Sequence, residues 1–336
     1  MTGFFVNLLM WINKLVGNYG WSIVVFTLLI RLVLLPLDIK SKKSMRQISK
    51  IQPKLQALQK KYANDKDKLN QKTMELYRKE HVSPTAGCLP MLISLPILWI
   101  MFSAMRTVGN EQTVQMLLDM KATNALPNLQ SWLWIKNVFQ PDSFAATILP
   151  KVGSTLAMVR PSNASAVLTQ ENISAAVEYL ASSDYSHLAA ALAPATAFST
   201  VTIPFIFRNI VLTLPNSLTN LFKYGNGLFI LPILAGASQF LMTKIMNGKQ
   251  TAEQKAAQEA QKNDQPQTNP MNSPVMKWFF PIFSVWICAT SNAAFSIYWM
   301  AANVIQIAQQ LAVNWYFDRQ DAKEAAKAAQ STDESI

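Results

Sequence analysis

The stretch Trp21–Leu37 reads WSIVVFTLLIRLVLLPL and places one arginine inside a run that otherwise suits a bilayer span. About 20 apolar residues are enough for a helix to cross the hydrocarbon core of a membrane. Insertion scales assign a cost of ~2.5–3.5 kcal/mol to a charged residue near the centre of such a helix. Two interpretations of Arg31 follow. Its side chain extends toward the cytoplasmic headgroups, or it faces a water-filled cavity that is open to one side.

The composition is that of a membrane protein. Half of the 336 residues are hydrophobic and 15% are charged, whereas a soluble protein carries about 25% charged residues. The net charge of +11 makes anionic partners plausible. Two cysteines (Cys88, Cys288) and two histidines (His81, His187) lie apart from any carboxylate cluster, and no nucleotide-binding glycine loop or nucleophile elbow is present. We therefore expect no enzyme, no metal and no cofactor.

Blocks of apolar residues predict an all-α integral membrane protein with five transmembrane helices and a cytoplasmic helical hairpin. The expected segments are an interfacial amphipathic helix (1–17), a first span (20–37), a cytoplasmic coiled-coil hairpin (38–87), a second span (88–107), an extracytoplasmic region (108–225), a third span (226–245), a cytoplasmic loop (246–275), a fourth span (276–291), a fifth span (293–316) and a cytoplasmic tail (317–336).

Charge asymmetry sets the expected orientation. Residues 38–87 hold 13 Lys and Arg against 5 Asp and Glu, whereas residues 108–225 hold 6 of each kind. Cytoplasmic loops carry the excess of basic residues. This predicts an external N-terminus and, after five spans, a cytoplasmic C-terminus.

The basic loop has a coiled-coil pattern. Apolar residues recur at steps of three and four and form a seam made of Ile48, Ile51, Leu55, Leu58 and Tyr62. The sequence ANDKD (63–67) predicts a turn, and a second helix is expected from Leu69 to Glu80. A solvated hairpin whose lysines attract anionic lipid is the simplest interpretation.

Polar residues occur at intramembrane depth beside Arg31. Trp299, Asn303, Gln306 and Gln310 recur at steps of 4, 3 and 4, so they form one stripe on the fifth span. Amides that face lipid would leave donors and acceptors unsatisfied. The stripe therefore faces other helices or water, and the sequence does not decide between these two. Thr27, Ser94, Ser238, Gln239 and Ser284 add further polar atoms. No predicted span supplies an acidic residue to pair with Arg31, which favours a hydrated groove that receives an anionic segment.

The extracytoplasmic region is rich in small and polar residues. ISAAVEYLASS (173–183) and HLAAALA (187–193) are candidate helices of a small subdomain. The run FSTVTIPFIF (198–207) is too short to span and contains a proline, so we place it in this external region, near the membrane interface. No chemistry is assigned to the region.

Several blocks together resemble the YidC-type membrane protein insertases and their mitochondrial and chloroplast Oxa/Alb-type relatives. LLIRLVLLPLDIKSKKSMRQI (28–48) resembles the first span of that family, with its single arginine and following proline. GCLPMLISLPI (87–97), WLWIKNVFQPD (132–142) and SIYWMAANVIQIAQQ (296–310) resemble later blocks in the same order. The order is more specific than any single block.

The resemblance implies an insertase that receives hydrophobic segments of nascent membrane proteins in a polar groove and releases them into lipid, alone or with the Sec translocon. The arginine of the family groove corresponds to Arg31, and the expected groove residues are Arg31, Thr27, Gln239, Trp299, Asn303 and Gln306. The implied partners are nascent substrates, the lipid bilayer, the Sec translocon and the ribosome, and no reading of nucleic acid is expected. The resemblance favours a compact bacterial form in the plasma membrane over an organellar one.

The sequence also departs from the family. The turn between the last two spans is TSNAA (290–294), region 108–225 is longer than in short members, and the tail is not strongly basic, which argues against ribosome tethering through it. Two other functions are weighed. A small-solute anion channel or transporter would use Arg31 as an anion site, but no internal repeat is visible. A membrane-anchored assembly scaffold would use the basic hairpin.

Overall fold

The structure is a computed structural model that describes residues 2–81, 89–151, 156, 159–205, 208–246 and 274–333. The predicted cytoplasmic loop lies almost wholly outside the described residues, as does the segment 82–87 that was expected to end the hairpin. The chain forms two compact units. The first contains Met1–Leu29, Ile100–Thr243 and Pro274–Val304, and the second contains Ile30–Trp99, Lys244–Ser273 and Ile305–Ile336.

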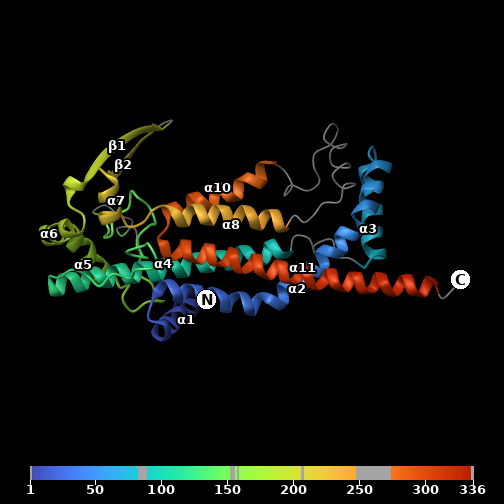
Figure 1. The fold of residues 1–336 in the computed structure, drawn as a ribbon, viewed down its shortest axis with the longest axis horizontal. Coiled ribbons are helices and arrows are strands. Elements are labelled where there is room, and N and C mark those ends of the chain that lie inside the picture. Colours follow the sequence, from blue (N-terminus) through green and yellow to red (C-terminus); the bar gives the residue numbers. More distant parts are fainter. Residues whose placement is uncertain are drawn as a thin grey trace. The chain divides into compact units, whose positions relative to one another are not determined.

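Helices dominate the described chain (Figure 1). In order, the elements are α1 (Thr2–Val16), α2 (Tyr19–Lys61), α3 (Lys66–Lys79), α4 (Leu89–Thr123), α5 (Gln170–Leu180), α6 (Ser183–Leu192), the 3-10 turn η3 (Ala195–Ala197), β1 (Phe198–Phe205), β2 (Arg208–Pro215), α7 (Leu218–Tyr224), α8 (Ile230–Met246), α10 (Pro274–Thr290) and α11 (Ala293–Asp333).

In the first unit, α1 folds back on the beginning of α2. Gly17 takes a φ of 77°, a left-handed conformation that glycine adopts at little cost, and so permits the reversal. Val6, Leu9 and Ile12 are buried on one side of α1. Phe4, Trp11 and Leu15 are exposed on another side. Helix α1 thus has one apolar side for packing and a second that suits the interfacial position predicted for it, which stays a prediction.

Helix α4 continues well past the predicted end of the second span. The extracytoplasmic region was predicted to begin at residue 108, but the helix runs to Thr123. Its last turns bury Val114, Leu117 and Met120 in a core shared with α5 and α6. Gly109 does not end helix α4, because one glycine inside a helix costs only about 1 kcal/mol. The subdomain within 108–225, which was predicted to be extracytoplasmic, is therefore built around an extension of a predicted span.

The fold is predominantly α-helical, as predicted, and the described chain also contains one short β hairpin. Strands β1 and β2 form an antiparallel hairpin in which Val201 pairs with Leu212 and Thr202 with Val211. Figure 1 shows this hairpin beside α7, close to α5 and α6. The run 198–207 was placed in the external region without an assigned secondary structure, although its consecutive β-branched residues at 200–203 are typical of strands.

Helices α8 and α10 lie side by side in the first unit (Figure 1). A Cβ on Gly236 would lie 2.4 Å from Cγ2 of Val285, so the close approach requires glycine. Phe240 stacks on Trp278 with ring centroids 5.4 Å apart. Helix α10 ends at Thr290 and α11 begins at Ala293, which gives the tight hairpin expected for the last two apolar segments.

The second unit contains the hairpin of α2 and α3. Asp65 caps α3 by accepting a hydrogen bond from the backbone N–H of Lys68 at 3.0 Å, so the turn lies where ANDKD predicted it. The amine of Lys54 donates to Glu80 at 2.6 Å and joins the two helices. Of the predicted seam, Ile51 is buried and the remaining residues are half-buried.

Arg46 joins α2 to the last part of α11 in the same unit. Its guanidinium contacts Asp318 at 2.6 Å and Asp321 at 3.1 Å, and it donates to the carbonyl of Asn314 at 3.2 Å. The same group lies 5.1 Å from the ring centroid of Phe317. The tail, which was expected only to be cytoplasmic, is thus a helical continuation of the fifth apolar segment.

Among the described residues, one helical segment, Tyr19–Ile48, is long and apolar enough to cross a membrane. Shorter apolar helices occur at Thr2–Val16, Ile230–Ile245 and Trp278–Thr290. The number of spans and their orientation therefore remain predictions.

Candidate functional site

Arg31 lies in α2 with its side chain half-buried. Asp38 and Lys42 follow two and three turns later on the same side of the helix, and the charges of all three groups interact. No predicted span supplies an acidic residue to Arg31, but Asp38 supplies a carboxylate that the expectation did not consider. The carboxylate comes from just beyond the predicted end of the span, so counting acids within the span could not reveal it.

A second polar contact at this position comes from α11 in the same unit. The side-chain amide of Gln309 donates to the backbone carbonyl of Arg31 at 3.1 Å. Pro36, inside α2, has no N–H to donate to the carbonyl four residues before it, so this stretch of backbone is less fully bonded than an ordinary helix. Gln309 was missed, although its spacing of three from Gln306 could have added it to the polar stripe.

Asn303 bonds between helices in the first unit. Its side-chain amide donates to the hydroxyl of Ser238 on α8 at 3.0 Å. The sequence did not decide whether the stripe faces other helices or a hydrated cavity. For Asn303, the structure shows an interhelical hydrogen bond. Gln310 instead donates to the side chain of Asn314, one turn along the same helix, at 3.1 Å.

The remaining predicted groove residues differ in their surroundings. Thr27 is buried, and its hydroxyl donates to the carbonyl of Ile23 at 2.6 Å, so its proton is used within its own helix. Trp299 is buried against Phe295, and its indole N–H lacks an acceptor among the described residues. Gln239 and Gln306 are half-buried.

The six candidates are divided between the two units. Thr27, Gln239, Trp299 and Asn303 belong to the first, and Arg31 and Gln306 belong to the second. A groove lined by all six stays a prediction.

The motif 132–142 ends in Asp142, a residue that was not among the predicted site residues. This carboxylate is fully buried and accepts from the backbone N–H groups of Leu228 (2.8 Å), Phe229 (3.1 Å) and Leu231 (2.7 Å). It also accepts from the indole of Trp134 at 3.3 Å. A carboxylate satisfies the free N–H groups at a helix N-terminus and interacts favourably with the helix dipole. Asp142 therefore caps α8.

Neighbouring residues of the motif bond to a second helix start. The carbonyls of Val138 and Gln140 accept from the N–H groups of Ala294 and Ala293 at the start of α11. The side chain of Asn226 donates to the backbone carbonyl of Asn137 at 2.9 Å. One short segment thus binds the N-terminal ends of two apolar helices. The only sequence signal for this role was the motif itself.

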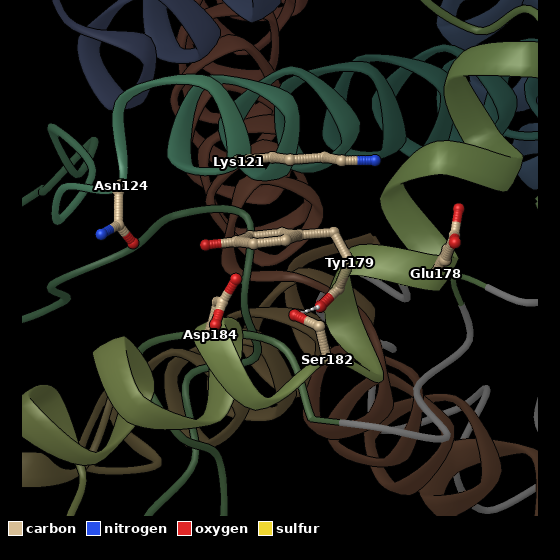
Figure 2. Close-up of a pocket in the computed structure, with 6 residues that line it drawn as sticks. All are labelled: Lys121, Asn124, Glu178, Tyr179, Ser182 and Asp184. Atoms are coloured by element: carbon tan, nitrogen blue, oxygen red, sulfur yellow. Dashed lines mark hydrogen bonds between the residues drawn. The ribbon is translucent and has the colours of Figure 1, made fainter.

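A small hollow of about 220 Å³ lies in the subdomain formed by the end of α4, α5 and α6 (Figure 2). It is lined by Lys121, Asn124, Glu178, Tyr179, Ser182 and Asp184. Burial, and then the charge of Asp184, raise the pKa of Tyr179, so this phenol stays neutral at physiological pH. Its hydroxyl has no hydrogen-bond partner among the described residues. The lining mixes both signs of charge, and nothing connects the hollow to the predicted groove.

The described residues contain no group of three or more His, Cys, Asp or Glu side chains arranged to hold a metal ion. One apolar helix, α2, carries the half-buried Arg31, and the polar motif 132–142 binds the starts of two others, α8 and α11. These features define a predominantly helical membrane protein. Residues 11–320 match the model of the 60Kd inner membrane protein family, and the chain belongs to this family.

Three relatives carry the name Membrane protein insertase YidC. The protein from Fusobacterium nucleatum is 40% identical over 148 residues, which are 44% of this chain and 63% of that protein. The one from Caldanaerobacter subterraneus is 48% identical over 101 residues, 30% of this chain and 49% of the relative. The one from Bordetella petrii is 41% identical over 107 residues, 31% of this chain and 19% of the relative. The chain therefore spans less than two thirds of each of these relatives.

Proposed function

We propose that this protein is a membrane protein insertase of the bacterial inner membrane. It receives hydrophobic segments of nascent membrane proteins and releases them laterally into lipid, alone or with the Sec translocon. The observation that carries the proposal is the placement of Arg31 in an apolar helix of a chain that belongs to the 60Kd inner membrane protein family. Relatives named as insertases support it, and that name describes a non-enzymatic role.

In this proposal, Arg31 attracts an acidic residue in the translocated end of the substrate. A positive charge in surroundings of low dielectric constant lowers the barrier for an anionic segment to enter the membrane. Asp38 already interacts with the Arg31 charge, so the substrate carboxylate exchanges with Asp38 instead of meeting an isolated cation. Burial of the apolar segment in lipid then drives release.

The proposed topology has five spans, an external N-terminus and a cytoplasmic C-terminus. The excess of basic residues in 38–87 supports a cytoplasmic hairpin. Thr27, Gln239, Trp299, Asn303 and Gln306 are proposed to line the groove with Arg31. Thr27 and Asn303 have the least freedom to meet substrate, because both are buried and each donates a hydrogen bond within the protein, to Ile23 and Ser238 respectively.

The test is depletion of the native protein with complementation by variants, scored by insertion of a single-span substrate. Two versions of the substrate, with an acidic and a neutral translocated tail, are compared. Arg31→Ala is expected to lower insertion of the acidic version on the order of tenfold, the value of about 1.4 kcal/mol of lost attraction. Arg31→Lys should be milder and Arg31→Glu more severe.

Arg106→Ala is the matched control, because Arg106 is an exposed arginine near the end of the second predicted span. Full insertion of the acidic substrate by Arg31→Ala would contradict the role of this arginine while leaving family membership intact. Loss of solute flux with insertion intact would support the anion channel, which the family does not favour.

A further inference from the structure

Helix α7 carries an apolar face that no other part of the described chain covers. Leu218 and Phe222 are 74% and 62% exposed. They lie one turn apart, so they share one side of the helix. Large exposed apolar patches mark surfaces that contact a partner or a membrane. We therefore expect this patch to contact a partner or a membrane.

The patch continues into an open hollow of about 410 Å³. Its lining is mostly apolar and comes from the end of β2, the turn that follows it, α7 and a residue of the distant loop 124–151: Leu214, Pro215, Asn216, Ser217, Leu218, Leu221 and Phe144. Phe144 is itself 40% exposed. The exposed face is thus wider than the two residues on α7.

Helix α7 is held firmly in its orientation despite its short length. At its start, the hydroxyl of Ser217 accepts from the N–H of Asn220 at 3.1 Å. At its end, the amine of Lys136 donates to the carbonyls of Phe222 and Lys223, each at 2.7 Å. Both ends are capped by polar groups, so the exposure of Leu218 and Phe222 is a built feature of the fold and not a consequence of fraying.

The neighbouring hairpin also exposes apolar surface. Strands β1 and β2 form a sheet of their own, paired from Phe198 with Pro215 to Phe205 with Arg208. Val201 is 42% exposed. An isolated two-stranded hairpin is at best marginally stable in water and gains stability by packing against another surface.

We propose that α7, with the base of the hairpin, binds the outer surface of the lipid bilayer. The occupant follows from position along the chain. Helix α8 begins at Ile230, eight residues after Phe222, so the two are separated by at most about 28 Å of extended chain. A buried Asp142 caps that same helix start. The patch thus adjoins the outer end of an apolar helix.

The residues that flank the patch suit an interface between lipid and water. Lys223 is exposed, and its amine lies 5.2 Å from the ring centroid of Tyr224. Basic and aromatic side chains beside an apolar face favour binding to anionic headgroups. A protein partner is the competing occupant and is one outcome of the test. The inference rests on the proposed topology, in which α8 is a span and 108–225 is extracytoplasmic.

In the test, the two native cysteines are first removed by Cys88→Ala and Cys288→Ala. Single cysteines are then introduced into the whole chain and labelled with a nitroxide, and the protein is reconstituted in vesicles of phosphatidylethanolamine and phosphatidylglycerol. Leu218→Cys and Phe222→Cys report on the patch. Thr219→Cys, exposed and about 100° round the helix from Leu218, is the matched control. Ile233→Cys reports whether α8 is in the membrane. Collision with oxygen and with a water-soluble nickel chelate is measured at each site.

The expected result is a severalfold lower nickel accessibility and a higher oxygen accessibility at positions 218 and 222 than at 219, with position 233 deeper still. Equal nickel accessibility at 218, 219 and 222, with 233 in lipid, would overturn this inference and leave the topology standing. Free access of nickel to 233 would overturn the topology. Protection of 218 and 222 from both reagents would show a protein contact in place of lipid.

Discussion

Removal of the Asp142 carboxylate is expected to loosen the start of α8. In the structure, one carboxylate oxygen accepts from the N–H groups of Leu228 and Phe229, and the other accepts from the N–H of Leu231 and the indole of Trp134. Asp142→Ala removes all four bonds. Asp142→Asn keeps one oxygen and places an amide NH₂, which cannot accept, opposite the remaining two donors.

The magnitude follows from the number of donors left without a partner. A buried donor that loses its acceptor costs roughly 1–3 kcal/mol, and the small cavity left by alanine admits water, so we take the lower value for each backbone N–H. Loss of the interaction between charge and helix dipole adds about 0.5–1 kcal/mol. We expect about 3–4 kcal/mol for Asp142→Ala and about 2 kcal/mol for Asp142→Asn.

Hydrogen exchange measures this effect locally, because opening of the helix start exposes its N–H groups. About 2 kcal/mol corresponds to roughly 30-fold faster exchange over 228–231 in Asp142→Asn, and Asp142→Ala should exceed 100-fold. Asp65→Asn is the matched control, since Asp65 also caps a helix but is exposed and accepts from one N–H. Its loss should cost about 1 kcal/mol or less. Exchange over 228–231 that is unchanged in Asp142→Asn would refute this account.

Two further predictions concern the second unit. Arg46→Ala should speed exchange at the end of α11 by up to about fivefold, since pairs as exposed as those with Asp318 and Asp321 are worth at most about 1 kcal/mol, and unchanged exchange would contradict the contact. The hydrogen bond from Lys54 lowers the pKa of Glu80. The pair therefore stabilises the α2–α3 hairpin at pH values above the unfolded pKa of about 4.3, and this stabilisation is lost as the pH falls through the lower pKa of the folded state. Spin-label distances across the hairpin should broaden on acidification, and Glu80→Gln should be broad at every pH; a wild-type distance that does not respond to pH would count against the pair.

Local sequence signals determined most of the helices. Apolar runs of helical length lie where α1, α2, α8, α10 and α11 are found, and the turn at 63–67 lies where Asp65 caps α3. These features depend on residues within a few positions of one another, so periodicity and capping residues reveal them. The ends of elements were less predictable. Helices α4 and α11 run past the predicted spans, and the extensions 108–123 and 317–333 contain no proline.

The β hairpin and the polar contacts were decided by the tertiary structure. Asp142 meets amides more than 80 positions further along the chain, and Gln309 meets the carbonyl of Arg31 across a separation of 278. Such pairs depend on how helices pack, which local propensity does not encode. Asn303 shows the same limit, because its place in a polar stripe fits a groove and an interhelical bond equally, and only the position of Ser238 decides.

Arg31 shows most clearly what the sequence determines and what the tertiary structure adds. Its presence in an apolar run, and hence the cost of placing it there, follows from the sequence alone. Its electrostatic neighbours, Asp38 and Lys42, also stand in the sequence, but their relevance appears only when α2 continues as one helix past the predicted end of the span. Continuous helical geometry puts all three charges on one side, and this arrangement determines what a substrate carboxylate would meet.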